Sequence, residues 1–254
     1  MSSSTWIRDA LRSESARLSG RFWRIVEAQH QSATMKLTDS LEEQTLLEDI
    51  IEDTKPPVPA DCDGLDFLLM TPFRYSATNP WGSRFRRPNA GAGVFYASAQ
   101  PSTSIAEAVF HRLQFFAESP GTPWPQNPAE YTAFAVELAS ERVLDLTARP
   151  AGDLAMIMHL QDYAAGQSLS DAARAAGAEI IKYPSVRDPQ RGANVAVLSP
   201  RAFRTKAPVD RQSWRIHLDR NGARAFCEAP RTSLGLGRNA FNADPRMHGF
   251  VWDR

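Results

Sequence analysis

The stretch GAGVFYASAQPSTSIAEAVFHRLQFF, residues 91–116, sets the class of the fold. Its glycines precede a short apolar and aromatic run at 94–97, which is typical of a strand. Pro101 then stands where a helix begins, and helical character continues to about Phe116. The stretch therefore predicts a turn, a strand, a second turn and a helix.

The rest of the chain mixes strands and helices. Alternating apolar residues at 132–138 and the run 143–146 predict two hairpin-like strands. A helical region is expected over 153–176, broken near Gly166 and ended by Gly177 as its C-cap. Later strands are expected at 179–183, 195–198, 213–218 and 223–228. Because strands and helices do not alternate regularly, the sequence predicts an α+β fold rather than a doubly wound sheet.

Two proline-rich stretches, 55–59 and 120–128, predict ordered loops, since proline does not fit a helix interior or a central strand. Before the first, the pair Ser40 and Glu43 has the form of a capping box. Apolar residues then recur at helical spacing up to Ile51. We expect an acidic helix near 40–52 that covers the core.

Composition excludes several classes of protein. The 254 residues carry 29 Lys+Arg and 29 Asp+Glu, so a nucleic-acid binder that relies on bulk charge is disfavoured. No run of 18 apolar residues and no signal peptide is visible, so we expect a cytoplasmic protein without a membrane partner. Cys62 and Cys227 stand far apart, and the five histidines show no ligand spacing. Metal catalysis therefore has no support in the sequence.

Dinucleotide-binding glycine motifs also fail. Gly91 and Gly93 precede a strand, whereas the fingerprint follows one. Gly235, Gly237 and Ala240 match the letters of the motif, but only 14 residues follow, too few to complete the binding unit. We interpret this second match as a turn in a C-terminal tail.

Four arginines fall within 14 residues among several aromatic residues. They are Arg74, Arg84, Arg86 and Arg87. The planar guanidinium binds phosphate oxygens through two hydrogen bonds, and aromatic rings offer a stacking face for a nicotinamide ring. The combination suits a dinucleotide ligand. The alternative is a solvated basic loop with its aromatic residues in the core.

Glu107 and Ser185 each allow two interpretations. Ser104 and Glu107 have the spacing of a capping box, in which the glutamate only closes the first helical turn. A carboxylate in that turn could instead point into the cleft of the arginines and stabilise a ribosyl oxocarbenium ion as nicotinamide leaves. Ser185, which follows Tyr183 and Pro184, could bind a ligand or satisfy a turn.

Taken together, these pieces resemble the RES family, named for a shared arginine, glutamate and serine, here Arg84, Glu107 and Ser185. The resemblance covers about 67–203. Its motifs occur in the family's order: Arg74-Tyr75, Gly82-Ser83-Arg84-Phe85, Phe95-Tyr96, Ala106-Glu107, and Ser185 with Asn194. Segments 23–59 and 115–124 further resemble a longer subgroup. Many members have Gly-Arg-Trp-Asn where this chain has Ser83-Arg84-Phe85-Arg86, a departure that bears on the substrate.

The resemblance implies a mixed sheet related to ADP-ribosyltransferases, with flanking helices. It implies an N-terminal extension at 1–66 packed on the core, a RES domain at 67–230 and a C-terminal tail at 231–254. It further implies an NAD-consuming toxin of a type II toxin–antitoxin system, with an Xre-like helix-turn-helix antitoxin as partner. NAD is the substrate, no metal is needed, and neither a membrane nor direct nucleic-acid binding is implied.

Members of the family either destroy NAD by hydrolysis or phosphorolysis or transfer its ADP-ribose to a protein, including phosphoribosyl pyrophosphate synthetase. We expect protein modification here, with NAD glycohydrolase or phosphorylase activity as the alternative. A non-catalytic module that binds nucleic acid or a protein is a further alternative, and it predicts salt-sensitive binding. A third hypothesis assigns antitoxin binding to the acidic helix at 40–52 or to the proline loop.

The resemblance also assigns roles to residues. The implied catalytic residues are Arg84, Glu107 and Tyr96, and the implied NAD-binding residues are Arg74, Tyr75, Arg84, Tyr96, Ser185 and Asn194. The two binding arginines would hold the pyrophosphate or the nicotinamide ribose, and the tyrosines would pack beside the nicotinamide. Glu107 would support ribosyl cleavage, and Ser185 would hydrogen-bond the dinucleotide. Arg86, Arg87 and His111 are expected at the mouth of the site, without an assigned role.

Overall fold

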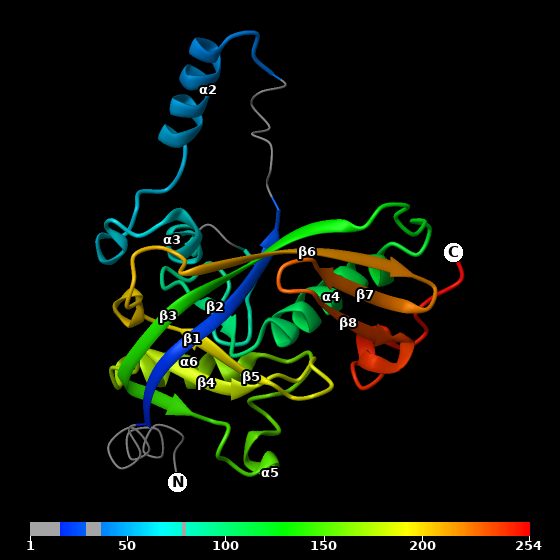
Figure 1. Ribbon diagram of the computed structural model, residues 1–254. Coiled ribbons are helices and arrows are strands. Elements are labelled where there is room, and N and C mark those ends of the chain that lie inside the picture. The colour runs from blue at the N-terminus through cyan, green and yellow to red at the C-terminus, as the bar shows by residue number, and fades with distance from the viewer. Residues whose placement is uncertain (1–15, 29–36, 78–79) are drawn as a thin grey trace.

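The computed structural model describes residues 16–28, 37–77 and 80–254 (Figure 1). These residues form one eight-stranded sheet in the order β1-β2-β5-β4-β3-β6-β7-β8, with β1 also paired to β3. The strands are β1 (Ala16–Glu27), β2 (Phe95–Ser98), β3 (Ala129–Asp145), β4 (Ile180–Pro184), β5 (Ala193–Val197), β6 (Asp210–Asp219), β7 (Gly222–Cys227) and β8 (Thr232–Gly237). The sheet is mixed, because β3 and β4 run parallel and the other pairs antiparallel.

Helices flank this sheet and confirm the predicted α+β class. They are α2 (Leu41–Asp53), α3 (Phe67–Arg74), α4 (Pro101–Glu118), α5 (Ala151–Leu154) and α6 (Ala164–Ala175). Short 3-10 turns are η2 (Ala60–Cys62), η3 (Pro200–Ala202), η4 (Arg238–Phe241) and η5 (Pro245–Met247). Among the described helices, none is long and apolar enough to span a membrane.

The sheet closes on itself through β1. This strand pairs along most of its length with β3, from Ala16 opposite Val143 to Glu27 opposite Tyr131. On its other side, β1 meets β2 at the single pair Trp23 and Ser98. The pairings therefore form the closed ring β1-β2-β5-β4-β3-β1, in which the single β1–β2 pair is the weakest join. This join, the β1–β2 seam, borders the cavity that is described below.

Three apolar clusters hold α3, α4 and α6 against the sheet. One joins α4 to β6, β7, β8 and the C-terminal turns, around the buried Phe110. A second joins α6 to β4 and β5 around Ile181, and a third joins α3 to β1, β2 and β3 around Phe134. Helix α4 belongs to the first cluster and strands β4 and β5 to the other two, and a cavity lies where these elements meet.

Several predicted elements match the structure closely. The quoted stretch forms β2 and then α4, which begins with Pro101 in its first turn as expected. The strands expected at 179–183, 195–198, 213–218 and 223–228 correspond to β4, β5, β6 and β7. Gly177, with a φ of +82°, follows the end of α6 and supplies the left-handed conformation expected of a C-cap glycine.

Other expectations are wrong in detail. The two hairpin-like strands are the single 17-residue strand β3, because no turn interrupts its pairing with β1. The helical region breaks over 155–163 rather than at Gly166, which lies buried inside α6. Gly235 and Gly237 lie in β8 rather than in a turn.

The expected extension and tail both contribute to the sheet. Strand β1 lies within 1–66, and β8 lies within 231–254. Phe241 and Met247 are buried in the same cluster as α4, so the C-terminal segment is part of the core. Residues 1–15 and 29–36 of the expected extension lie outside the described residues.

The expectation that α2 packs on the core is wrong. The Ser40 side chain does cap the helix by accepting from the backbone N–H of Glu43 at 3.1 Å. None of the helix residues is buried, and Leu46 and Ile50 are 60% and 52% exposed. Figure 1 shows α2 standing away from the sheet. The apolar residues that recur along α2 therefore lie at the surface and do not contact the core.

Candidate active site

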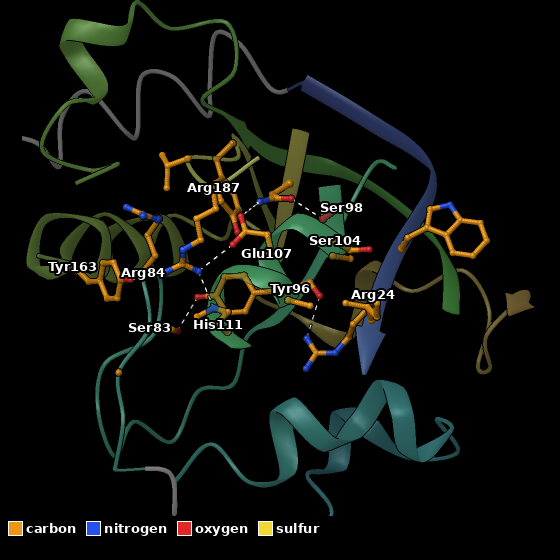
Figure 2. Close-up of a pocket in the computed structure, with 18 residues that line it drawn as sticks. Arg24, Ser83, Arg84, Tyr96, Ser98, Ser104, Glu107, His111, Tyr163 and Arg187 are labelled. Carbon is orange, nitrogen blue, oxygen red and sulfur yellow. Dashed lines mark hydrogen bonds and ion pairs between the residues drawn. The ribbon is translucent and has the colours of Figure 1, made fainter. Parts of the chain in front are cut away.

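A cavity of about 350 Å³ lies where the β1–β2 seam, α4 and the ends of β4 and β5 meet. Figure 2 shows labelled polar side chains from β1, β2 and α4 around it, and Tyr183 of β4 and Asn194 of β5 also line it. Its volume falls at the lower end of the range of roughly 300–1,000 Å³ that is typical of small-molecule sites. Residues from the segment 82–84 and Tyr163 complete its wall.

Glu107 reaches this cavity from the second turn of α4. The helix is capped at Gln100, and the Ser104 hydroxyl donates to the Pro101 carbonyl at 2.8 Å. The interpretation of Ser104 and Glu107 as a capping box is therefore wrong, because the helix begins three residues earlier. Glu107 is free of a capping role and lines the cavity.

Three donors fix the Glu107 carboxylate. The Ser185 hydroxyl and the Asn194 side-chain amide donate to Oε1 at 2.7 and 2.9 Å, and Arg187 Nη1 donates to Oε2 at 3.0 Å. The Glu107 side chain is 24% exposed, and that of Arg187 is 11% exposed. A carboxylate held in this way presents a fixed negative charge to a ligand at little reorganisation cost.

Ser185 and Asn194 are buried and act on Glu107. Ser185 also accepts from the backbone N–H groups of Arg187 and Asp188, at 3.2 and 2.9 Å, so it satisfies a turn and holds the carboxylate at once. The Ser98 hydroxyl donates to the side-chain oxygen Oδ1 of Asn194 at 2.7 Å, and this bond directs the side-chain nitrogen Nδ2 toward Glu107. Asn194 lines the cavity, and the Ser185 hydroxyl is directed to Glu107.

Arg187 links Glu107 to the far wall. Its guanidinium lies 4.4 Å from the ring centroid of Phe110 and donates to the Tyr163 hydroxyl at 2.9 Å. Its Nη1 also lies 2.8 Å from Nε2 of His111. Since arginine only donates, this histidine nitrogen is the acceptor, and the ring proton is on Nδ1. The site thus contains a neutral histidine beside a cation.

Burial, together with the positive charge of Arg187, lowers the pKa of His111 to about 4. The His111 ring is therefore neutral at pH 7. Its place on the cavity wall agrees with the expectation that it lies at the mouth. A neutral ring accepts a hydrogen bond from Arg187 and leaves the Arg187 guanidinium aligned with Glu107.

Two further guanidiniums, those of the buried Arg84 and the half-buried Arg24, supply positive charge to the cavity. Arg84 Nη1 donates to the carbonyls of Ile157 and His159 at 3.0 and 2.8 Å, and burial lowers its pKa. Arg24 donates to the Tyr96 carbonyl at 3.1 Å, and burial lowers its pKa to about 10. Among the described residues, no carboxylate lies within ion-pair distance of either guanidinium. Both line the cavity, so an anionic ligand group would supply the missing counter-charge.

Tyrosines form the aromatic part of the wall. The Tyr96 hydroxyl lies 2.8 Å from the Ser83 hydroxyl and accepts from the Phe85 N–H at 3.1 Å. Burial raises the pKa of Tyr96 and raises that of Tyr183 well above its ordinary value, so both phenols are neutral. The ring of Tyr163 lies 5.0 Å from the Arg84 guanidinium. These rings provide stacking faces beside the charged groups.

Of the residues implied by the sequence, the structure brings together Arg84, Tyr96, Glu107, Ser185 and Asn194. It places Arg74 and Tyr75 elsewhere, since neither lines the cavity.

Arg74 donates from Nη1 to Glu52 at 2.6 Å and from Nε to the Pro56 carbonyl at 2.6 Å. It therefore ties the end of α2 to α3. Arg86 donates to the Trp81 carbonyl, and Arg87 pairs with Asp171 at 2.6 Å, so both hold loops outside the cavity.

Sequence reasoning assigned no role to Arg24, Tyr163 or Arg187. Arg187 lies two residues after Ser185 within a motif that the sequence singled out. This closeness to Ser185 in the sequence could have marked Arg187 as a candidate site residue. Arg24 lies in β1, which the sequence did not predict, and Tyr163 lies at the end of an irregular loop. Neither position has a pattern that points to a site.

In the part of the chain that the structure describes, no cluster of three metal-ligating side chains occurs.

Comparisons with known proteins identify the family of this chain. The model of the RES domain family matches residues 58–219, which include every residue of the Glu107 network. A comparison with curated proteins found no match. Among solved structures, a chain of the M. tuberculosis MbcT–MbcA toxin–antitoxin complex is similar at 14% identity and a TM-score of 0.45, over 96% of this chain and 97% of that one. Because the family model spans more than half of the sequence, the chain belongs to the RES domain family.

Proposed function

We propose that this protein cleaves the nicotinamide glycosidic bond of NAD and transfers the ADP-ribose to a protein. The observation that carries the proposal is the fixed Glu107 carboxylate in the same cavity as the guanidiniums of Arg84 and Arg24, neither of which has a carboxylate partner among the described residues. NAD carries a cationic nicotinamide riboside and an anionic pyrophosphate. The cavity therefore offers charge of the right sign to each half.

In the proposed reaction, the bond between ribose C1′ and the nicotinamide nitrogen breaks. Nicotinamide keeps both electrons of that bond and leaves as a neutral ring, while positive charge develops on the ribose. Glu107 stabilises that charge, as carboxylates do in glycoside cleavage. An acceptor oxygen or nitrogen then bonds to C1′ and loses its proton, which balances the exchange without a metal.

The other residues bind and orient. Arg84 and Arg24 would hold the pyrophosphate, because a guanidinium binds phosphate oxygens through paired hydrogen bonds. Tyr96 would pack beside the nicotinamide ring. Ser185 and Asn194 keep Glu107 in place. Arg74 and Tyr75, the other two predicted NAD-binding residues, do not line the cavity, and the contacts of Arg74 with Glu52 and Pro56 favour a role in holding α2.

The proposal includes a place in a toxin–antitoxin pair, with phosphoribosyl pyrophosphate synthetase as a candidate target and an Xre-like protein as the antitoxin. Membership of the RES domain family supports this part. The exposed apolar residues of α2 offer the antitoxin a surface, since a 13-residue helix with no buried face is only marginally stable alone. We place the pair in the cytoplasm.

The acceptor decides between transferase, hydrolase and phosphorylase. NAD labelled in its adenine ring is incubated with the purified protein, alone, with phosphate and with a cell lysate, and products are separated by mass. Label on a protein band supports the transferase. Free ADP-ribose, or its phosphate, would assign a hydrolase or phosphorylase. No nicotinamide release in any arm would remove the enzymatic proposal and favour a binding module.

A further inference from the structure

The C-terminal segment beyond the family match contacts residues that stand behind the wall of the cavity, although none of its own residues lines the cavity. Arg246 lies in η5, 27 residues after the match ends at 219. Asp244 holds its guanidinium through two hydrogen bonds, from Nε to Oδ1 at 2.9 Å and from Nη2 to Oδ2 at 2.6 Å. The Asp244 side chain is only 4% exposed. Such a buried, doubly bonded pair fixes the guanidinium in one orientation.

Arg246 uses this orientation to hold the loop 155–163, which joins α5 to α6. Its Nη2 donates to the Leu160 carbonyl at 2.8 Å. The same loop supplies the Ile157 and His159 carbonyls that hold Arg84. Arg246 is thus connected to Arg84 through one short stretch of backbone.

A second path leads from Arg246 to Glu107. The guanidiniums of Arg246 and Arg187 lie 4.8 and 4.4 Å from the centroid of the same buried ring, Phe110. Tyr163 receives a hydrogen bond from Arg187. Hydrogen bonds that Arg246 donates to Asp244 and Tyr163 raise the pKa of Arg246. Arg246 therefore stays charged beside the cation that holds Glu107.

We propose that Arg246, oriented by Asp244, is a positioning residue that fixes the loop 155–163 and Arg187, and so sets the places of Arg84 and Glu107. The positions of these cavity residues then depend on contacts from the C-terminal segment as well as on the RES domain. This inference rests on the proposed NAD cleavage for its kinetic readout. Its structural readout does not depend on activity.

The test compares Arg246→Gln, Asp244→Asn/Arg246→Gln and the matched control Arg238→Gln. Arg238 lies in the same C-terminal segment and pairs with the exposed Asp253 at 3.5 Å, away from the cavity. The single Arg246 variant leaves a buried carboxylate without its cation, so it is expected to lose stability. The double variant removes that charge as well and is expected to regain much of the melting temperature.

Kinetics of nicotinamide release separate positioning from stability. We expect kcat/KM for NAD to fall roughly tenfold to a hundredfold in both Arg246 variants, since small displacements of binding groups have effects of this size. In an Arg84→Lys background, Arg246→Gln should lose most of its effect, because both act on the same group. Normal kcat/KM in the double variant, or full additivity with Arg84→Lys, would overturn the proposal.

Hydrogen exchange gives the readout that needs no turnover. Amides of the loop 155–163 should exchange faster in both Arg246 variants than in Arg238→Gln, while those of β7 should not change. Unchanged exchange in the loop would overturn the inference. If the parent protein releases no nicotinamide, the proposed function fails, and the exchange result still decides the role of Arg246.

Discussion

Replacing Glu107 with glutamine removes a negative charge from the cavity wall and keeps the size of the side chain. The amide oxygen can still accept from Ser185 and Asn194, which lie 2.7 and 2.9 Å from Oε1. The new NH₂ group faces Nη1 of Arg187, which lies 3.0 Å from Oε2 in the parent, so two donors oppose each other. The variant therefore loses the charge and the ion pair together.

The expected magnitude follows from these contacts. Loss of one preorganised electrostatic group typically lowers kcat by roughly 10²–10³-fold, about 2.7–4 kcal/mol. A hydrogen bond to a charged group contributes roughly 1.5–3 kcal/mol to folding. Because Glu107 is 24% exposed, we take the lower end, about 1.5 kcal/mol, or roughly 3–6 °C in melting temperature for a chain of this size.

The assay is nicotinamide release from NAD, followed by chromatography at several substrate concentrations. Glu118→Gln is the matched control, because Glu118 lies at the exposed end of the same helix, outside the cavity lining, and accepts from Gln114 at 3.0 Å. Its kcat should equal that of the parent. Parent-like turnover by the folded Glu107→Gln protein would refute the assignment of the carboxylate.

Three further predictions follow from other contacts. Ser185→Ala removes one donor to Glu107 and should lower kcat about tenfold with little change in KM, as steady-state kinetics would show; an unchanged kcat would contradict this. Leu46→Lys combined with Ile50→Lys should weaken the complex with the antitoxin in a titration and leave NAD turnover as in the parent; unchanged affinity would remove α2 from the interface. Burial and a neighbouring guanidinium lower the pKa of His111 from 6.5 to about 4 in the folded protein. As the pH falls, the unfolded chain therefore takes up a proton before the folded protein does. The stability that is present above pH 6.5 is lost as the pH falls toward 4. The melting temperature of His111→Gln should therefore fall less between pH 6.5 and 4, and equal slopes would refute this.

Local patterns in the sequence predict the elements around the site well. The run at 94–97 and Pro101 give β2 and α4 because glycine, β-branched and aromatic residues and proline act on their own neighbours. Strand β3 is read as two strands, because its continuity depends on pairing with β1, which is distant in sequence. Strand β8 is missed for a different reason, since Gly235 and Gly237 favour a turn, and the segment is a strand through its pairing with β7.

The site also has features that the sequence predicts and features that depend on the tertiary structure. Glu107 and Ser185 are predicted through a resemblance, yet the bond that joins them depends on α4 and the end of β4 meeting in space. The helix of α2 is predicted correctly, but its exposure is not, because an amphipathic pattern marks an apolar face without saying what covers it. Arg74 follows a family motif and points to Glu52, a partner that only the tertiary structure supplies.

Release of nicotinamide from NAD by the purified parent protein tests the central claim most directly. The measurement is a time course at fixed NAD, with nicotinamide quantified by chromatography and Glu107→Gln run beside it. We predict steady release by the parent and a rate lower by at least roughly a hundredfold in the variant. No release by the folded parent, or equal release by both proteins, would contradict the account.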